Sequence, residues 1–304
     1  MAEGPDAPQV VAIVVSYQPD LSRLEMLLEA LTPQVDGIVI VDNGSAVDVA
    51  GWHRALAPRG NSHTVVGLGA NRGIAAAQNA GIAWAREHAA THVLLMDQDS
   101  IPPPGMVAAL YAVLQVQTDA AAAGPQYVDA RQGRPAPFIR REGLRLLRLE
   151  CDVGSAPARA DYLIASGCLI PMPVIDAVGA MREDLFIDYV DIEWGLRARA
   201  HGWQSYGVYT TRMHHELGDP PVRFFGRMLP MHSPLRHYYH VRNAVLLYRE
   251  RWVPLGWKLV DGWRLLLKFG FYSLVPPRRG SHCRMMALGL WHGLRGRSGP
   301  WTKR

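Results

Sequence analysis

Short runs of branched apolar residues alternate with helix-like segments over the first hundred residues. This alternation restricts the fold more than any other feature of the chain. Four such runs, at residues 10–15, 38–41, 64–66 and 93–96, read as buried strands. Leucines at helical spacing follow the first run, and an alanine-rich segment at residues 74–88 predicts a further helix. Strands that alternate with helices form a parallel sheet covered on both faces. We therefore expect an α/β fold with a mostly parallel, nucleotide-binding sheet and helices on both faces.

Each of these strands leads into residues that can bind a ligand. The carboxyl ends of parallel strands lie at one edge of a sheet, and ligands bind in the crevice outside that edge. The candidates are Ser16 and Tyr17 after the first strand, Asp42 and Asn43 after the second, Asn71, Arg72 and Gly73 after the third, and Asp97, Gln98 and Asp99 after the fourth.

The two carboxylates of Asp97 and Asp99 are the sharpest of these signals. Mg²⁺ and Mn²⁺ prefer oxygen ligands and often bridge a carboxylate to substrate phosphates. Most acidic pairs of this spacing are only solvated loop residues, but the position directly after an apolar strand favours a metal site. We therefore expect a divalent cation here.

The other strand ends suggest contacts with a nucleotide. Asp42 and Asn43 can accept the imide N–H of uracil or thymine, although the same residues also fit a simple turn. The segment 71–73 opens a helix, which places amide N–H groups and the Arg72 guanidinium near phosphates. Asn79 lies further along the same helix.

A glycine pattern in the same region offers an alternative. Gly67, Gly69 and Gly73 imitate the glycine-rich loop of dinucleotide-binding enzymes. That loop follows the first strand and precedes an acidic strand end by about 20 residues. Neither condition holds here, which disfavours an oxidoreductase.

The second half of the chain is less regular. Residues 161–170 read as a strand that crosses a break at Ser166 and Gly167. Residues 191–201 read as a helix, with Asp191 as its N-cap and Gly202 as its stop.

The C-terminal part differs from the rest in charge. Residues 223–304 carry 16 of the 32 Lys and Arg but two of the 27 acids, which gives +14 against −9 for residues 1–222. Five of the nine tryptophans also lie there. We expect a catalytic domain at residues 8–222 and a basic, Trp-rich helical extension at residues 223–304.

One long helix of this extension is amphipathic. Residues 252–275 are mostly apolar, and four charged residues approximate a stripe. This pattern fits a helix in the interface of an anionic membrane, with Trp257 and Trp263 as anchors. The alternative is a helix packed on the core with a basic outer face. The charges interrupt any membrane span, and no motif indicates a nucleic-acid partner.

The cysteines and the start of the chain bear on location. Three cysteines, none in a Cys-x-x-Cys pair, fit a reducing compartment. No signal-peptide pattern precedes the first strand. We expect a cytoplasmic protein, peripheral on the inner face of the cell membrane.

The ordered set of motifs resembles glycosyltransferase family 2, the inverting enzymes with the GT-A fold. The resemblance covers roughly residues 10–218, and its variants are most similar to bacterial rhamnosyltransferases of O-antigen and cell-wall assembly, whose donor is dTDP-L-rhamnose. The segments that carry it are residues 14–17, 41–45, 69–73, 79–81, 97–99, 165–167, 185–194 and 214–218.

The resemblance implies a role for several residues. Asp42 would contact the base, Asp97 the donor ribose or the metal, and Asp99 would be the main metal ligand. His215 would be a later ligand, although His214 adjoins it. Asp191 would be the catalytic base that deprotonates the acceptor hydroxyl.

The sequence departs from the family at that base. Many members have two adjacent acids where this chain has Val190 and Asp191, so Asp188 and Glu193 compete for the role. The residues that we expect on the acceptor or phosphate side are Gly167, Asp188, Glu193, Trp194 and Arg242.

The implied reaction transfers a sugar from a nucleotide-diphosphate donor to a glycan acceptor, most readily one linked to a lipid. Three alternatives remain open at this level. They are a family 2 transferase with a UDP-sugar donor, a nucleotidyltransferase that releases pyrophosphate, and a sugar-nucleotide-binding protein without turnover.

Overall fold

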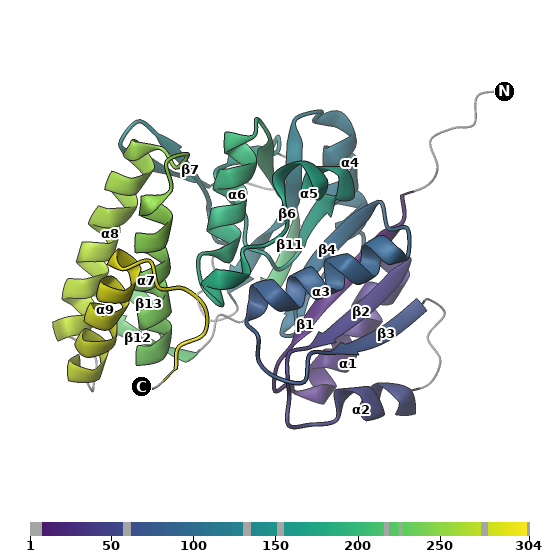
Figure 1. Ribbon diagram of the computed structural model, residues 1–304. Helices are drawn as coiled ribbons and strands as arrows, with labels where there is room; N and C mark the ends of the chain where they lie inside the picture. The colour runs from purple at the N-terminus through teal and green to yellow at the C-terminus, as the bar shows by residue number, and fades with distance from the viewer. Residues whose placement is uncertain are drawn as a thin grey trace.

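The computed structural model describes residues 8–56, 62–129, 135–150, 155–215, 219–224, 227–274 and 279–302. Within this part, a nine-stranded sheet runs through the molecule, helices cover both of its faces, and three C-terminal helices stand beside it (Figure 1). The predicted α/β class is confirmed.

The N-terminal half of the sheet is parallel and has the strand order β3-β2-β1-β4. In this register Ser16 lies opposite Asp42, Asp42 opposite Gly67, and Val15 opposite Asp97. The four polar strand ends therefore form one line along the edge of the sheet. The strands are β1 (Val10–Ser16), β2 (Gly37–Asp42), β3 (Ser62–Gly67) and β4 (His92–Asp97).

The other half of the sheet is mixed. β10 is antiparallel to both β4 and β6, whereas β11 is parallel to β6. The short strands β5 and β9 pair antiparallel with β11. The bounds are β5 (Ser100–Ile101), β6 (Ala120–Asp129), β9 (Ala158–Ala160), β10 (Cys168–Pro171) and β11 (Gln204–His215).

The strand predicted at residues 161–170 is wrong except at its end, since β10 begins at Cys168. Gly167 adopts φ +82°, a left-handed conformation that interrupts an extended strand. A side chain at Gly167 would come within 2.7 Å of the Pro125 ring, so glycine is required at this turn.

Alternate residues of β1 point to opposite faces of the sheet. Val11 and Ile13 pack with α3 (Ile74–Glu87), α5 (Met172–Val178) and α6 (Val190–Ala200). Ala12 and Val14, on the other face, pack with α1 (Leu21–Leu31), α2 (Val49–Ala55) and α4 (Met106–Val116). This alternation is the expected consequence of the two-residue period of a strand.

Two small hairpins lie outside the main sheet. One pairs β7 (Phe138–Glu142) with β8 (Arg145–Leu149), and the other pairs β12 (Asp219–Phe224) with β13 (Arg227–Met231).

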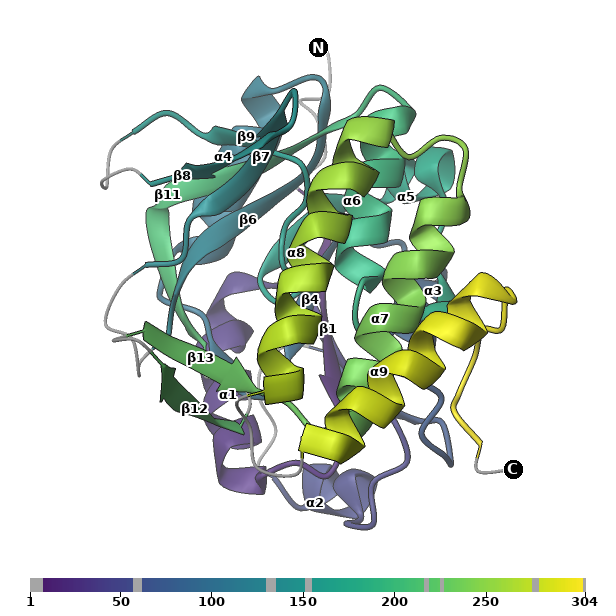
Figure 2. The same ribbon diagram turned by 90° about the vertical axis from the view of Figure 1, so that its left-hand side faces the viewer.

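Three helices form the described end of the chain: α7 (Pro234–Arg249), α8 (Leu255–Leu274) and α9 (Arg279–Leu294). Figure 2 shows α7 and α9 side by side, with α8 next to them. Leu246, Leu247 and Trp257 from these helices belong to the same buried core as β1 and α3. The domain boundary at residues 222 and 223 stays a prediction. No helix among the described residues is long and apolar enough to span a bilayer.

Candidate active site

The turn that carries the two strand-end acids is fixed by a buried serine. The Asp97 N–H donates to Ser166 Oγ at 3.1 Å, and the Ser166 hydroxyl donates to Ser100 Oγ at 2.7 Å. Ser166 therefore holds the turn on both sides of Asp99. Its role was not predicted, although it belongs to the segment 165–167 that the family pattern singled out. The Gly167 N–H of that segment donates to Leu95 O at 2.7 Å, so this group supports the strand end and is not directed at a ligand.

Gln98 connects this turn to the end of β1. The Tyr17 N–H donates to Gln98 Oε1 at 2.8 Å, and Gln98 Nε2 donates back to Tyr17 O at 3.1 Å. The side chain expected to touch the donor is thus a bridge between two loops. The Tyr17 ring is 45% exposed at this edge, whereas Ser16 is fully buried and offers no side-chain contact.

The end of β2 is tied to the loop before α3. Asn43 Oδ1 accepts the Arg72 N–H at 2.8 Å, and Asn43 Nδ2 donates to Asn71 Oδ1 at 3.2 Å. Asn71 Oδ1 also accepts the Gly73 N–H at 3.0 Å. Because Asn43 is only 4% exposed, it positions this loop. Asp42 is half-buried and accepts the Ser45 N–H at 3.1 Å, and the Arg72 side chain is exposed.

The loop before α3 also contacts the turn before α6. Gly73 adopts φ +90°, and a Cβ there would lie 2.4 Å from Phe186 O. The Ile74 N–H donates to that same oxygen at 2.8 Å. Glycine at position 73 therefore allows the two loops to meet.

Asn79 has a different role from the one predicted. Its Oδ1 accepts the Met181 N–H at 2.9 Å, and its Nδ2 donates to Met181 O and to Glu183 Oε1 at 2.9 and 2.8 Å. The whole amide is engaged in fixing the segment 181–183. Both N–H groups of the amide are used in this way, so donor contact by Asn79 stays a prediction that only the second lone pair of Oδ1 could fulfil.

The turn at residues 186–189 precedes α6 and is unusual in its backbone. Phe186, Asp188 and Tyr189 all adopt φ between +63° and +67°, although none is a glycine. Left-handed conformations of this kind cost free energy, and proteins keep them where the surroundings enforce them.

A buried asparagine enforces this turn. Asn243 Nδ2, from α7, lies 2.9, 2.7 and 2.9 Å from the carbonyl oxygens of Leu185, Ile187 and Asp188. The Arg242 guanidinium donates to Leu185 O at 2.9 Å and to Gly299 O. Arg242 is 1% exposed, so its predicted contact with acceptor or phosphate is wrong. A polar pair inside an otherwise apolar stretch of helix was the available signal.

Asp191 lies in the first turn of α6 and lines a pocket together with Leu95 of β4. Tyr189, not Asp191, is the N-cap, because the left-handed turn places the cap two residues earlier than predicted. The Asp191 side chain is half-buried and accepts the Ile192 N–H at 2.9 Å. The pKa of Asp191 is raised to about 6, mainly by burial, with smaller contributions from the neighbouring carboxylates of Asp188 and Asp97. A carboxylate with a pKa near the working pH is suited to proton transfer.

The two competing acids are engaged elsewhere. Asp188 pairs with Arg236 of α7 at 3.2 Å. Glu193 is 2% exposed and pairs with Arg197 at 2.9 Å on the side of α6 that faces α5. Asp191 has no ion pair among the described residues. We therefore retain Asp191 as the candidate base.

Trp194 is the remaining residue expected on the acceptor side. It is 4% exposed, and its Nε1 donates to Gly179 O at 2.9 Å. Its ring packs α6 onto the core, so contact with an acceptor is a wrong prediction.

A divalent cation fits the acids at the end of β4. Mg²⁺ and Mn²⁺ are commonly held by one or two carboxylates together with substrate phosphates, and Asp97 and Asp99 supply two such groups. The backbone of His215 pairs with Ser100, directly after Asp99, which brings the third predicted ligand to the same turn. The side chains of His214 and His215, and residues 216–218, lie outside what the structure describes. Among the described residues, no three His, Cys, Asp or Glu side chains form a metal-binding group.

Comparison with known proteins identifies the family. A family model described as "Glycosyltransferase like family 2" matches residues 8–228. The chain belongs to this family. It is 36% identical over 248 residues to the dTDP-rhamnosyl transferase RfbF of Shigella flexneri. This alignment covers 81% of this chain and 82% of the relative. The resemblance to family 2 and its rhamnosyltransferases is therefore confirmed, and the protein is a glycosyltransferase.

Solved glycosyltransferase structures share the fold of this family 2 member. GalNAc-T7 with UDP, GalNAc and Mn²⁺ superposes with a TM-score of 0.65 and 12% identity, over 96% of this chain and 57% of that chain. TarS residues 1–349 from S. aureus, in complex with UDP-GlcNAc, gives 0.63 and 12%, over 95% of this chain and 81% of that chain. The GT-A architecture is thereby confirmed.

Proposed function

We propose that the protein is an inverting glycosyltransferase that transfers L-rhamnose from dTDP-L-rhamnose to a lipid-linked glycan acceptor, in the synthesis of O-antigen or another cell-surface polysaccharide. The observation that carries the reaction type is that Asp191 lines one pocket with Leu95, two residues before Asp97 at the acidic end of β4. Asp97 lies close enough to Asp191 to raise its pKa. The donor assignment rests on the similarity to the rhamnosyltransferase of Shigella flexneri.

Asp191 acts as the base in this proposal. Its ionised carboxylate accepts the proton of the acceptor hydroxyl while that oxygen attacks the anomeric carbon. The bond to the nucleoside diphosphate breaks on the opposite side of the sugar, which inverts the configuration. Proton transfer by a positioned side chain contributes about 10²–10⁴-fold to the rate.

The donor lies along the edge formed by β1 to β4. Asp42, half-buried at the end of β2, accepts the imide N–H of thymine, and the exposed Tyr17 ring flanks the base. The exposed Arg72 guanidinium contacts the diphosphate.

Asp97, Asp99 and His215 would hold the divalent cation. Such an ion, Mg²⁺ or Mn²⁺, would neutralise the charge on the departing diphosphate. The residues around it contribute position: Ser166 and Gln98 fix the turn that presents both acids.

A donor screen tests this proposal. The purified protein is incubated with sugar nucleotides, Mg²⁺ or Mn²⁺ and lipid-linked acceptors, and nucleoside diphosphate release is measured. We expect release from dTDP-L-rhamnose and little from ADP- or GDP-sugars. Preference for a UDP-sugar would replace the donor assignment, and release of pyrophosphate would indicate a nucleotidyltransferase. If ADP protects the protein against thermal unfolding as well as dTDP does, Asp42 does not select the base.

We also propose that the protein is cytoplasmic and binds the inner face of the cell membrane through α8. The outer side of this helix presents a continuous apolar stripe: Leu255, Leu259, Trp263, Leu266, Leu267 and Leu274 are each 54–74% exposed. An exposed apolar stripe on a helix of a strongly basic region is typical of helices at an anionic lipid surface. Trp257 takes no part in this contact, contrary to our expectation, because it is 4% exposed and packs in the core.

Vesicle sedimentation tests this membrane contact. The protein should pellet with anionic vesicles, release in part at high salt, and bind neutral vesicles poorly. Leu266→Asp should weaken pelleting about tenfold or more, since burial of a leucine side chain contributes a free energy of up to about 3 kcal/mol. Leu144→Asp, at an exposed leucine of the β7–β8 turn, is the matched control. If the Leu266 variant pellets normally but loses a dimer in solution, α8 is an interface between copies of the chain.

A further inference from the structure

The charged side of α8 faces the catalytic domain. Lys258, Asp261, Arg264 and Lys268 follow one another at helical spacing, on the side opposite the exposed leucines. In an ordinary surface helix the apolar stripe faces the core and the charges face water. In α8 the charged residues share the side that packs on the core through Trp257, while Arg264 and Lys268 stay exposed and can therefore be reached by a ligand from solvent.

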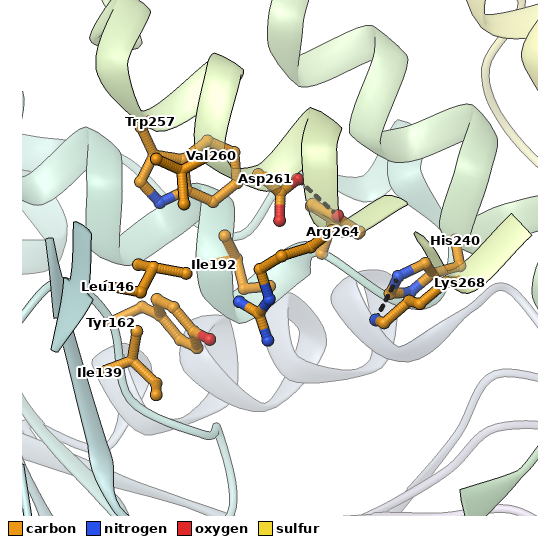
Figure 3. Close-up of a pocket in the computed structure, with 11 residues that line it drawn as sticks. Ile139, Leu146, Tyr162, Ile192, His240, Trp257, Val260, Asp261, Arg264 and Lys268 are labelled. Atoms are coloured by element: carbon orange, nitrogen blue, oxygen red, sulfur yellow. Dashed lines mark hydrogen bonds between the residues drawn. The ribbon is translucent and has the colours of Figure 1, made fainter. Parts of the chain in front are cut away.

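A pocket separates this charged side from the catalytic domain. It has a volume of about 60 Å³ and lies between α8, the β7–β8 hairpin, α7 and the start of α6. This volume exceeds several-fold the roughly 10–15 Å³ that one water molecule requires. Figure 3 shows the side chains of α8 entering the pocket above Tyr162.

Two of the charged residues in the pocket already have partners. Asp261 Oδ2 accepts hydrogen bonds from the Tyr189 and Tyr248 hydroxyls at 2.8 and 2.6 Å. Lys268 Nζ lies 3.0 Å from His240 Nε2. Burial keeps the pKa of His240 well below its usual range, so this imidazole is neutral and accepts from the ammonium group.

Arg264 is the charged residue without such a partner. Within the described part of the chain, its guanidinium makes no hydrogen bond and no ion pair, and it extends from α8 into the pocket toward the Tyr162 hydroxyl (Figure 3). Five N–H donors are thus available beside the Lys268 ammonium group.

The pocket adjoins the candidate base. Ile192, which lines it, directly follows Asp191 and donates its N–H to the Asp191 carboxylate at 2.9 Å. The Tyr162 hydroxyl, inside the pocket, is close enough to sense both Arg264 and Asp191, although burial is the main reason that its pKa is raised. A group bound by Arg264 therefore lies beside the candidate base.

We infer that this pocket binds a phosphate or pyrophosphate group of the acceptor, with Arg264 as its main ligand and Lys268 as the second. The planar guanidinium matches two oxygens of such a group, and the ammonium group adds a point charge. This inference rests on the proposed function. It is supported by the opposite face of the same helix, whose leucines would lie in the lipid. An acceptor joined to a lipid through phosphate would place its charge at this level, between the bilayer and the catalytic base.

A titration with inorganic pyrophosphate tests the pocket directly. The protein, without added metal and saturated with dTDP to fill the donor edge, is titrated in a calorimeter. We expect binding by the wild type, and about 10–100-fold weaker binding by Arg264→Gln, as for the loss of hydrogen bonds to a charged group. Arg264→Lys should keep part of the affinity.

Two variants serve as controls for this titration. Arg284→Gln removes the same charge from an exposed position on α9 outside the pocket, and should bind like the wild type. Arg72→Gln alters the donor edge, and should also leave the affinity unchanged. No binding by the wild type, equal binding by Arg264→Gln, or an equal loss in Arg284→Gln would overturn the inference. Lys268→Gln, expected to weaken binding less, supplies a second test if the Arg264 variant unfolds.

Kinetics separate this inference from the proposed function. With a phosphate-linked lipid acceptor, Arg264→Gln should raise the acceptor KM about tenfold or more, and leave the donor KM unchanged. With the same glycan on a neutral alkyl chain, the variant and the wild type should be alike. If no sugar nucleotide supports transfer, the proposed function fails, while the pyrophosphate titration still decides the pocket. If transfer occurs and Arg264→Gln has no effect with either acceptor, the assignment of the pocket to the acceptor is wrong.

Discussion

The donor edge and the acceptor side of this site are built in different ways. At the donor edge, Ser16, Asp42 and Asp97 are each the last residue of a strand, and register alone places them in one line. On the acceptor side, the turn at residues 186–189 is held by residues about 50 to 70 positions further along: Asn243, Arg236 and Asp261. The residues of the donor edge are therefore positioned by neighbouring sequence. The position of the base instead depends on the C-terminal helices.

The largest expected effect comes from the loss of the proposed metal ligand Asp99 at the donor edge. Asp99→Ala should lower turnover below detection, and a chelator should do the same to the wild type, because a bound cation contributes several kcal/mol to the stabilisation of a departing phosphate. Nucleoside diphosphate release measures the loss. We also expect weaker binding of dTDP, since a cation held by Asp99 would offset the charge of its phosphates. Full activity in the chelator would contradict the metal assignment.

Asp191→Asn tests the acceptor side of the site. We expect turnover to fall by about 10²–10⁴-fold, because the amide cannot accept a proton. Donor binding, followed by the thermal shift that dTDP produces, should stay near that of the wild type. This separates the variant from Asp99→Ala. If Asp191→Asn retains most of its activity and Asp188→Asn does not, the base is Asp188.

Asn243→Ala tests whether α7 supports the turn. The change leaves carbonyl groups of residues 185–188 without their amide donor, and each buried polar group left unsatisfied costs about 1–3 kcal/mol. We expect a free energy of unfolding lower by about 2–4 kcal/mol in urea titrations, together with reduced turnover at temperatures where the variant is folded. Donor affinity should change little if the two sides are built independently. Unchanged stability and turnover would show that the turn does not depend on α7.

The smallest effect is a gain in stability. The native pKa of Asp191 is about 6 against an ordinary value of 3.8, so the folded state binds this proton more tightly than the unfolded state. The ionised carboxylate therefore destabilises the native protein fully above pH 6, and the penalty vanishes below about pH 4. Asp191→Asn should exceed the wild type by about 1–3 kcal/mol at pH 8. The difference should shrink toward pH 4, in urea titrations with a chelator present. A difference that does not vary with pH would contradict the raised pKa.

Sequence patterns predicted the donor edge well because strands, their ends and the helix at residues 74–88 are encoded by neighbouring residues. The observed β1, β2, β3 and β4 each contain the predicted run. The roles of Trp194 and Arg242 were mistaken, and the structural role of Asn79 was missed, for a common reason. Residue type and spacing do not show whether a polar group is used by a distant backbone segment, as Asn79 is by Met181.

The orientation of α8 could not be predicted for a related reason. Periodicity identified its charged stripe, yet it did not show which side the catalytic domain would cover. That choice depends on Tyr189 and Tyr248, whose hydroxyls bond Asp261 from other parts of the chain.

Arg242 and Asn243, which bond the carbonyl groups of the turn before α6, affect how chimeras of related enzymes can be built. The matched family region ends at residue 228, before α7 begins at Pro234. A chimera joined at that point would exchange the helix that shapes the catalytic turn, and would pair a strained loop with a foreign support. A junction after Arg249 keeps α7 with its own loop, and it exchanges only α8 and α9. Swaps of acceptor preference between relatives should therefore be made at the second junction.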